Sequence, residues 1–146
     1  AVIVDYAHTP DGLEAVLEAA RAVTRRSLVV VFGAGGNRDQ GKRPQMGEVA
    51  RRLADRVVVT NDNPRSENPT AIIASVVSGM HKSPDLVEPD RRMAIRHAFA
   101  AAGNGDVVLI AGKGHEMTQT IGSDVIEFDD RAVARDELRR IGGSIS

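Results

Sequence analysis

The stretch from Asn61 to Pro69, NDNPRSENP, places two acids, one arginine and two prolines directly after an apolar run. In Asp62-Asn63-Pro64-Arg65 the proline fixes one backbone torsion and restrains the residue before it. The guanidinium group of Arg65 can bind a carboxylate through two parallel hydrogen bonds, and Asp62 can receive an ammonium group. These two side chains match the charged groups of an amino acid. The alternative is that they pair with each other in a capped turn.

A glycine-rich segment, Gly33–Pro44, offers a second candidate site. It begins like a dinucleotide-binding fingerprint, but Arg38 stands where the third glycine belongs. It also has the glycine and lysine spacing of a P-loop, but Arg43 follows Lys42 where a serine or threonine would hold magnesium. Its glycines can still expose backbone N–H groups to an anion, with three basic side chains beside them. The alternative is a strand-to-helix turn with solvated charges.

The segment Gly112–Glu116, GKGHE, follows another apolar run. Its glycines expose the backbone, Lys113 can bind a phosphate or a carboxylate, and Glu116 can receive an ammonium group. His115 can act as a ligand or carry a proton, although a single loop histidine usually does neither. His8 has no second histidine at the spacing of metal ligands, so we assign no metal to this chain.

Short apolar runs alternate with apolar patterns of helical period along the chain. The expected strands are 2–4, 28–32, 57–59, 86–87 and 107–111, followed by a hairpin of 119–121 and 125–128. Helices are expected after the caps Thr9, Asn68 and Asp90, from Pro44, and from Asp129 or Asp130 to about Arg140. This order predicts a three-layer, Rossmann-like α/β fold, whose open sheet is mostly parallel with an antiparallel edge and has helices on both faces.

The polar segments occupy equivalent places in this fold. In open parallel sheets, ligands bind beyond the carboxyl ends of the strands. Segments rich in glycine, proline or charge follow four expected strands, beginning at Asp5, Gly33, Asn61 and Gly112. The opposite strand ends carry ordinary turns. We therefore expect the four segments to converge on one edge of the sheet and form a site.

Composition limits the classes of function. The 146 residues, 42% of them apolar, fit a single domain, 1–146. A net charge of −1 and 3% aromatic residues argue against nucleic-acid binding, and the absence of cysteine excludes disulfides. No apolar run approaches the roughly 20 residues that span a bilayer. We expect a cytoplasmic protein without nucleic-acid or membrane partners. Paired arginines such as 51–52 and 91–92 are expected on solvated faces or ends of helices.

Four motifs follow one another along the chain, namely DYAHTPD from Asp5, GGNRDQGKRP from Gly35, DNPR from Asp62 and KGHE from Lys113. Together they closely resemble the C-terminal domain of the UDP-N-acetylmuramoyl-tripeptide synthetases of the Mur ligase family. The resemblance covers essentially the whole chain. It implies a bacterial cytoplasmic enzyme that joins a diamino acid to UDP-N-acetylmuramoyl-L-alanyl-D-glutamate in peptidoglycan synthesis. The DNPR motif resembles that of enzymes adding meso-diaminopimelate rather than L-lysine.

The resemblance also implies roles for individual residues. Arg65 would hold the distal carboxylate of meso-diaminopimelate, while the carbonyl of Gly112 and the side chain of Glu116 would meet its distal ammonium group. The residues implied for this substrate are Arg38, Asp62, Asn63, Pro64, Arg65, Gly112 and Glu116. Asp5, and with it His8, would lie near the nucleotide.

The family's ATP-binding P-loop, magnesium ligands and carbamylated lysine lie in a central domain, and nothing in this chain matches them. We therefore expect one domain of three, without a catalytic residue of its own. ATP and Mg²⁺ would be held mainly by domains outside the chain, whose missing initiator methionine agrees with this view. The isolated domain is expected to be inactive. Two alternatives are a Mur-type domain for L-lysine or another amine, and a non-catalytic Rossmann-like module that binds a nucleotide or anion.

Overall fold

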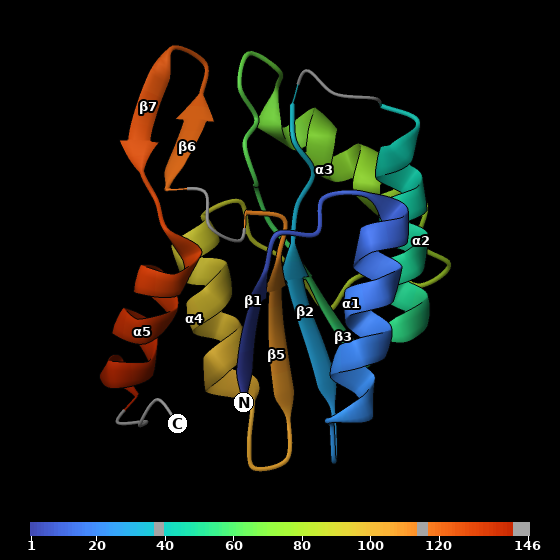
Figure 1. Ribbon diagram of the computed structural model, residues 1–146. Helices are drawn as coiled ribbons and strands as arrows, with labels where there is room; N and C mark the ends of the chain where they lie inside the picture. The colour runs from blue at the N-terminus through green and yellow to red at the C-terminus, as the bar shows by residue number, and fades with distance from the viewer. Residues whose placement is uncertain (37–39, 114–116, 142–146) are drawn as a thin grey trace.

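The main sheet of the computed structural model has five strands, and the structure describes residues 1–36, 40–113 and 117–141. The strands are β1 (Val2–Asp5), β2 (Leu28–Phe32), β3 (Arg56–Val59), β4 (Leu86–Val87) and β5 (Val107–Ala111). Their order is β1-β5-β2-β3-β4, and every neighbouring pair is parallel (Figure 1). The carboxyl ends of all five strands therefore point to the same edge.

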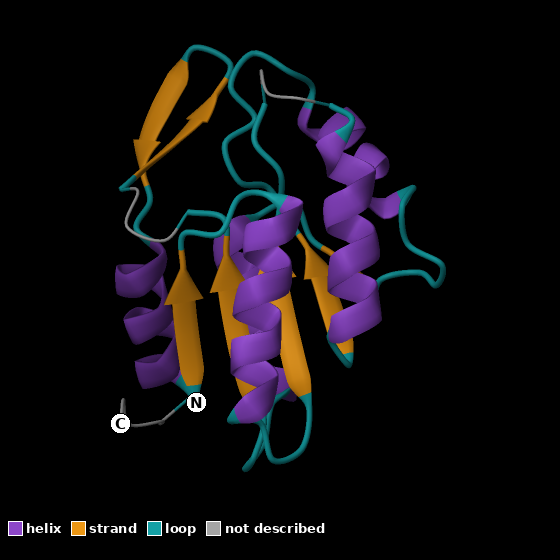
Figure 2. Cartoon of the chain, turned by 45° about the vertical axis from the view of Figure 1, so that its right-hand side comes forward, coloured by secondary structure: helices purple, strands orange, loops and turns teal. Residues whose placement is uncertain are grey.

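Helices cover both faces of this sheet (Figure 2). They are α1 (Pro10–Ala22), α2 (Lys42–Leu53), α3 (Pro69–Val77), α4 (Arg91–Ala101) and α5 (Asp130–Arg140). Alternate strand residues face opposite sides, so Val30 packs in the core beneath α1, α2 and α3, whereas Val29 and Val31 pack beneath α4 and α5. The predicted three-layer α/β class is confirmed.

The predicted helix starts are set by local capping. Thr9 Oγ1 accepts from the Gly12 amide at 3.0 Å, and Asp90 Oδ1 accepts from the Met93 amide at 3.2 Å. Helix α2 begins two residues before the expected Pro44. Proline is compatible with this first turn because the first four N–H groups of a helix have no partner within the helix.

The two antiparallel strands lie in a different place from the one expected. Strands β6 (Thr118–Ile121) and β7 (Asp124–Glu127) form a separate two-stranded sheet rather than an edge of the main sheet. Figure 1 shows this hairpin beyond the carboxyl ends of the strands. The hairpin bonds instead to the segment after β3: the Arg65 amide donates to the carbonyl of Thr120 in β6 at 2.7 Å, and the amide of Gly122 in the turn donates to the Arg65 carbonyl at 2.5 Å.

Two arginines that were expected on solvated faces or ends of helices are buried. Arg91 is 1% exposed and Arg51 is 6% exposed. Arg51 donates to Asp85 Oδ2 at 2.9 Å and to the carbonyl of Asp55 at 2.8 Å, beside the amino ends of β4 and β3. A guanidinium group can be buried in this way because its five donors match carboxylate and carbonyl oxygens. Within the described residues, no helix is long and apolar enough to cross a membrane.

Candidate functional site

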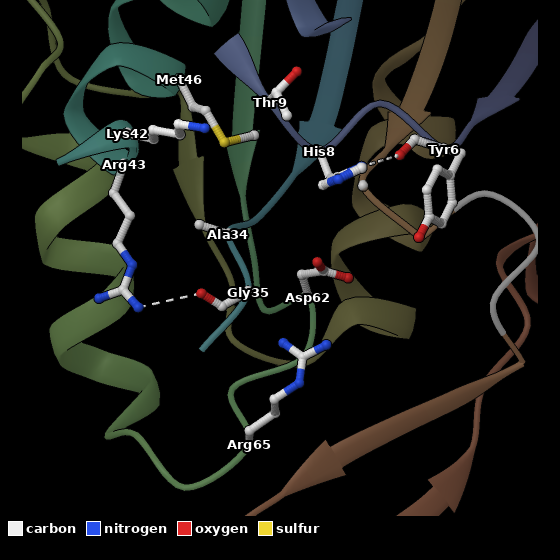
Figure 3. A pocket seen from close by; sticks show the side chains of 11 residues that line it. Tyr6, His8, Thr9, Ala34, Gly35, Lys42, Arg43, Met46, Asp62 and Arg65 are labelled. Atoms are coloured by element: carbon white, nitrogen blue, oxygen red, sulfur yellow. Dashed lines mark hydrogen bonds between the residues drawn. The ribbon is translucent and has the colours of Figure 1, made fainter. Parts of the chain in front are cut away.

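A cavity of about 280 Å³ lies at the carboxyl ends of the strands (Figure 3). Residues that follow four strands, together with the start of α2, surround it. The lining residues are Tyr6, His8, Thr9, Ala34, Gly35, Lys42, Arg43, Met46, Asp62, Arg65 and Gly112. The expected convergence of the four polar segments is confirmed, since each contributes to the lining.

Arg65 is fixed at one side of the cavity. Its φ of 56° lies in the left-handed region, which is uncommon for a residue with a side chain. Its Nη1 donates to the carbonyls of Gly36 at 2.9 Å and Asn63 at 3.3 Å. Figure 3 shows the guanidinium group directed toward Asp62 and Gly35. One guanidinium nitrogen thus anchors the side chain, which leaves the rest of the fork for another acceptor.

The alternative of a direct Asp62–Arg65 pair is not what the structure contains. Among the residues that the structure describes, no ion pair within 4.0 Å joins these two side chains. Asp62 is 5% exposed and lines the cavity from the segment after β3. A carboxylate and a guanidinium group therefore both border the cavity, and each can form charge-assisted hydrogen bonds with a group of opposite charge.

Gly112 brings the segment after β5 against Asp62. Its φ is 109°, a conformation that glycine adopts without strain, and a Cβ atom added there would lie 3.6 Å from Asp62 Cγ. The backbone of Asp62 is fixed from the other side, because Gln119 Nε2 donates to its carbonyl at 2.8 Å. Two segments that lie far apart in sequence thus meet at one wall of the cavity.

Asn63 and Pro64 shape the loop and are not among the lining residues. Asn63 is 5% exposed, and its Oδ1 accepts from the Thr120 amide of the hairpin at 2.7 Å. Its carbonyl accepts from the Gly36 amide at 2.7 Å. At Gly36 an added Cβ would lie only 1.7 Å from the Pro64 carbonyl oxygen. These contacts join the segments after β2 and β3 to β6.

The segment after β1 supplies an aromatic pair. Tyr6 and His8 both line the cavity, with ring centroids 5.0 Å apart in an edge-to-face arrangement. Asp5 instead accepts a hydrogen bond from the Ala7 amide at 2.9 Å and is not a lining residue. Sequence reasoning missed Tyr6, although it is the single tyrosine of the chain and directly follows Asp5.

Two basic side chains differ from their expected exposure. Arg43 is 4% exposed and donates to Glu67 Oε2 at 2.8 Å and to the Gly35 carbonyl at 3.2 Å, so it is not a solvated charge. Lys113 is fully buried, and its ammonium group donates to the Thr118 carbonyl at the start of β6. The Lys113 ammonium group therefore lies at the start of β6, and Lys113 is not among the residues that line the cavity.

Three residues named from the sequence, Arg38, His115 and Glu116, lie outside the described residues. In the described part of the chain, no three His, Cys, Asp or Glu side chains gather into a group that could hold a metal ion.

The sequence model of a protein family described as "Mur ligase, glutamate ligase domain" matches residues 1–114, which is most of the chain. The chain therefore belongs to the Mur ligase family. Two relatives of this family are the UDP-N-acetylmuramoyl-L-alanyl-D-glutamate–2,6-diaminopimelate ligases of Parasynechococcus marenigrum (strain WH8102) and Geobacillus kaustophilus (strain HTA426). They are 60% identical over 140 residues and 53% identical over 143 residues. The match covers 95% and 97% of this chain but only 28% and 29% of the relatives.

Solved structures agree with the Mur ligase assignment. A structure of UDP-N-acetylmuramoyl-L-alanyl-D-glutamate–2,6-diaminopimelate ligase superposes with a TM-score of 0.91 at 41% identity, covering 98% of this chain and 30% of that one. A bifunctional folylpolyglutamate synthase/dihydrofolate synthase from Yersinia pestis gives a TM-score of 0.60 at 20% identity, covering 76% of this chain and 25% of that one. The second likeness shows a common fold alone. The chain spans less than a third of the length of the relatives it matches.

Proposed function

We propose that this chain is the amino-acid-binding, C-terminal domain of an ATP-dependent ligase that adds meso-diaminopimelate to UDP-N-acetylmuramoyl-L-alanyl-D-glutamate in bacterial peptidoglycan synthesis. The names of relatives at 53–60% identity support this assignment. The whole enzyme would include further domains for the uridine nucleotide and ATP, and it would act in the cytoplasm.

The geometry of Arg65 is the observation that carries the proposal. Its guanidinium group is anchored through Nη1 to two carbonyls, and no other described residue accepts from its Nε or Nη2. These two donors are adjacent on the fork, which is the arrangement that binds a carboxylate with two hydrogen bonds. We assign this position to the distal carboxylate of meso-diaminopimelate, a group that lysine lacks.

Asp62 and Gly112, which also line the cavity, are assigned to the second distal group of the substrate. Asp62 provides negative charge beside Gly112, and together they suit the distal ammonium group of the same substrate. Arg38 and Glu116, which lie outside the described residues, would complete this recognition. Asn63 and Pro64 would act through the shape of the loop, because their contacts are with Gly36 and the hairpin.

The chemistry assigned to this domain is orientation of an amine. In the proposed reaction, ATP converts the side-chain carboxyl group of D-glutamate into an acyl phosphate, the amine of diaminopimelate attacks its carbonyl carbon, and phosphate leaves. A site that holds both distal charges of diaminopimelate fixes the reacting amine, and such positioning can account for much of a rate enhancement. Since the described residues hold no group of three His, Cys, Asp or Glu side chains that could bind a metal ion, we assign Mg²⁺ mainly to the domains outside this chain. Asp5 and His8 would contribute to the nucleotide side of the cleft.

The proposal is tested by ligation with the full-length enzyme and either meso-diaminopimelate or L-lysine. Loss of a buried, charged hydrogen-bond partner costs about 2–5 kcal/mol, or about 30- to 4,000-fold in kcat/KM. We expect the wild-type enzyme to prefer meso-diaminopimelate by a factor in this range. Arg65→Ala should remove most of this preference while leaving ligation of lysine little changed.

Arg25→Ala serves as the matched control, because Arg25 is exposed in the turn before β2, at the amino end of the sheet. It should keep the wild-type preference. Equal rates of the wild-type enzyme with both amino acids, or an Arg65→Ala enzyme that keeps the preference, would contradict the proposal. Nucleotide binding by this chain with no ligation by the full-length enzyme would instead support the alternative of a non-catalytic nucleotide-binding module.

A further inference from the structure

Arg91 forms a buried network outside the cavity, at the first residue of α4. Its side chain has no exposed surface, and neither does that of Asp130 at the first residue of α5. Arg91 Nε donates to Asp130 Oδ1 at 2.8 Å, and Nη2 donates to Oδ2 at 2.7 Å. The pair is therefore bidentate, the arrangement in which both partners are most strictly oriented.

The same guanidinium group also binds the backbone of two strand ends. Nη1 donates to the Asn61 carbonyl at 2.9 Å, and Nη2 donates to the Ala111 carbonyl at 3.0 Å. Asn61 directly precedes Asp62, and Ala111 directly precedes Gly112. Arg91 therefore bonds to the residues directly before Asp62 and Gly112, the two residues of the cavity wall that is assigned to the ammonium group.

Asn61 is held a second time by the segment before α4. Its Nδ2 donates to the Pro89 carbonyl at 2.9 Å, two residues before Arg91. The ends of β3 and β5 are not neighbours in the sheet, because β2 lies between them. No backbone hydrogen bond of the sheet therefore joins them directly, whereas the guanidinium group of Arg91 bonds to the carbonyls of both Asn61 and Ala111.

Stability alone does not account well for such a network. Replacing a buried ion pair with apolar side chains of similar volume is often neutral or stabilising, because two charges must be removed from water. The orientation of the two carbonyls, by contrast, depends on donors at fixed angles. Apolar replacement of both partners can therefore restore stability but not the orientation of the two carbonyls, and this outcome separates a structural role from a positioning role.

We propose that Arg91, oriented by Asp130, is a positioning residue that sets the spacing and direction of Asp62 and Gly112 across the cavity. The kinetic part of this proposal rests on the proposed function, since it concerns binding of meso-diaminopimelate. The part that concerns the position of the backbone does not rest on the proposed function. Loss of the Arg91 donors should let the segments 61–65 and 111–113 move relative to each other.

The test uses three variants of the full-length enzyme, Arg91→Lys, Arg91→Met and the double variant Arg91→Met/Asp130→Met. Misplacement of binding groups by about 1 Å can cost about 100-fold in rate. We expect each variant to lose about 10- to 100-fold in kcat/KM for meso-diaminopimelate, mainly through a higher KM. The double variant should regain the melting temperature lost by Arg91→Met but not the KM.

Arg51→Lys is the matched control. Arg51 is also a nearly buried arginine that donates to an aspartate and to backbone carbonyls, but at the amino ends of the strands, away from the cavity. It should lower the melting temperature as Arg91→Lys does and leave the KM for meso-diaminopimelate within about twofold of wild type, as expected of a site remote from substrate.

Amide hydrogen exchange of residues 61–63, 65 and 111–113 provides a readout that needs no substrate. Faster exchange there in Arg91→Lys, but not in Arg51→Lys, would support the positioning role even if the wild-type enzyme did not ligate diaminopimelate, a result that would contradict only the proposed function. Recovery of both melting temperature and KM in the double variant would overturn the proposal. Unchanged exchange in Arg91→Lys would overturn it as well.

Discussion

Arg65 combines an unusual backbone conformation with the side chain that carries the proposed function. A left-handed conformation costs a residue with a Cβ atom roughly 1–2 kcal/mol, and Arg65 adopts it with φ of 56°. The cost is offset locally, because its amide donates to Thr120 and its carbonyl accepts from Gly122. Strain retained at this position fits a residue whose side chain must point in one direction.

The strain at Arg65 leads to a prediction that separates backbone from side chain. Arg65→Gly should be about 1 kcal/mol more stable than Arg65→Ala, because glycine adopts positive φ without penalty. Both variants should lose the preference for meso-diaminopimelate, since neither has a guanidinium group. Urea unfolding and the ratio of kcat/KM values for the two amino acids measure these effects. Equal stability of the two variants would argue against backbone strain at this residue.

Gly36 lies where the backbone of a neighbouring segment leaves no room for a side chain. An added Cβ atom would lie 1.7 Å from the Pro64 carbonyl oxygen, which is backbone and has little freedom to move. Gly36→Ala should therefore destabilise the chain by about 1–3 kcal/mol in urea unfolding and raise the KM for meso-diaminopimelate. Gly103→Ala is its control, because an added Cβ there meets nothing within 4 Å. A stable, active Gly36→Ala enzyme would contradict the close approach of the two segments.

At the scale of elements, the hairpin β6–β7 supports the segment that carries Arg65. The Asn63 side chain, the Asp62 carbonyl and the Arg65 backbone all bond to β6. Lys113 fixes the start of the same strand through the Thr118 carbonyl. The hairpin is therefore part of the site even though none of its residues lines the cavity.

Removing one of these hairpin contacts should loosen the loop. Asn63→Ala leaves the Thr120 amide without its acceptor, and an unsatisfied polar group in a partly buried contact costs about 1–3 kcal/mol. We expect that loss in urea unfolding, together with a higher KM for meso-diaminopimelate. Val125→Thr, at an exposed residue of β7, should stay within about 0.5 kcal/mol of wild type. An unchanged KM in Asn63→Ala would show that the hairpin does not support the site.

At the scale of the whole molecule, charged side chains lie at both ends of the sheet and have different partners at each end. The carboxyl ends carry the cavity with its cationic and anionic side chains. At the amino ends, carboxylates accept hydrogen bonds from backbone amides in the strands and in the turns before them. Asp106 accepts from the Gly103 and Ser27 amides, both at 2.9 Å, and these bonds lower its pKa below the ordinary 3.8. The hydrogen bond from Arg21 and the Leu28 amide likewise lower the pKa of Asp55.

These lowered pKa values predict acid lability. A carboxyl group whose pKa is lower in the folded chain stabilises the fold above its unfolded pKa, and this contribution is lost as pH falls through the folded value. We expect the free energy of unfolding to fall as pH drops below about 4. Asp106→Asn should be less stable at pH 7 and less dependent on pH in this window. Asp124→Asn, at the exposed first residue of β7, should follow the wild-type curve. A wild-type curve that is flat between pH 5 and 2 would contradict the prediction.

The sequence by itself determined the order of elements and the edge where the site lies. Strand and helix periods are local properties, and caps such as Thr9 and Asp90 act over three residues. Parallel strands then place all their carboxyl ends together, so the four polar segments had to converge. The motifs also carried the family resemblance, which the match over residues 1–114 confirms.

Only the tertiary structure decided how the site is held. Arg91 bonds to Asp130, 39 residues away, and Asn63 bonds to Thr120, 57 residues away. Periodicity and capping act over a few residues, so no local pattern distinguishes the buried Arg91 from its partly exposed neighbour Arg92. The burial of Arg91 and Lys113, the separate hairpin and the absence of an Asp62–Arg65 pair in the described chain all depend on partners that folding brings together.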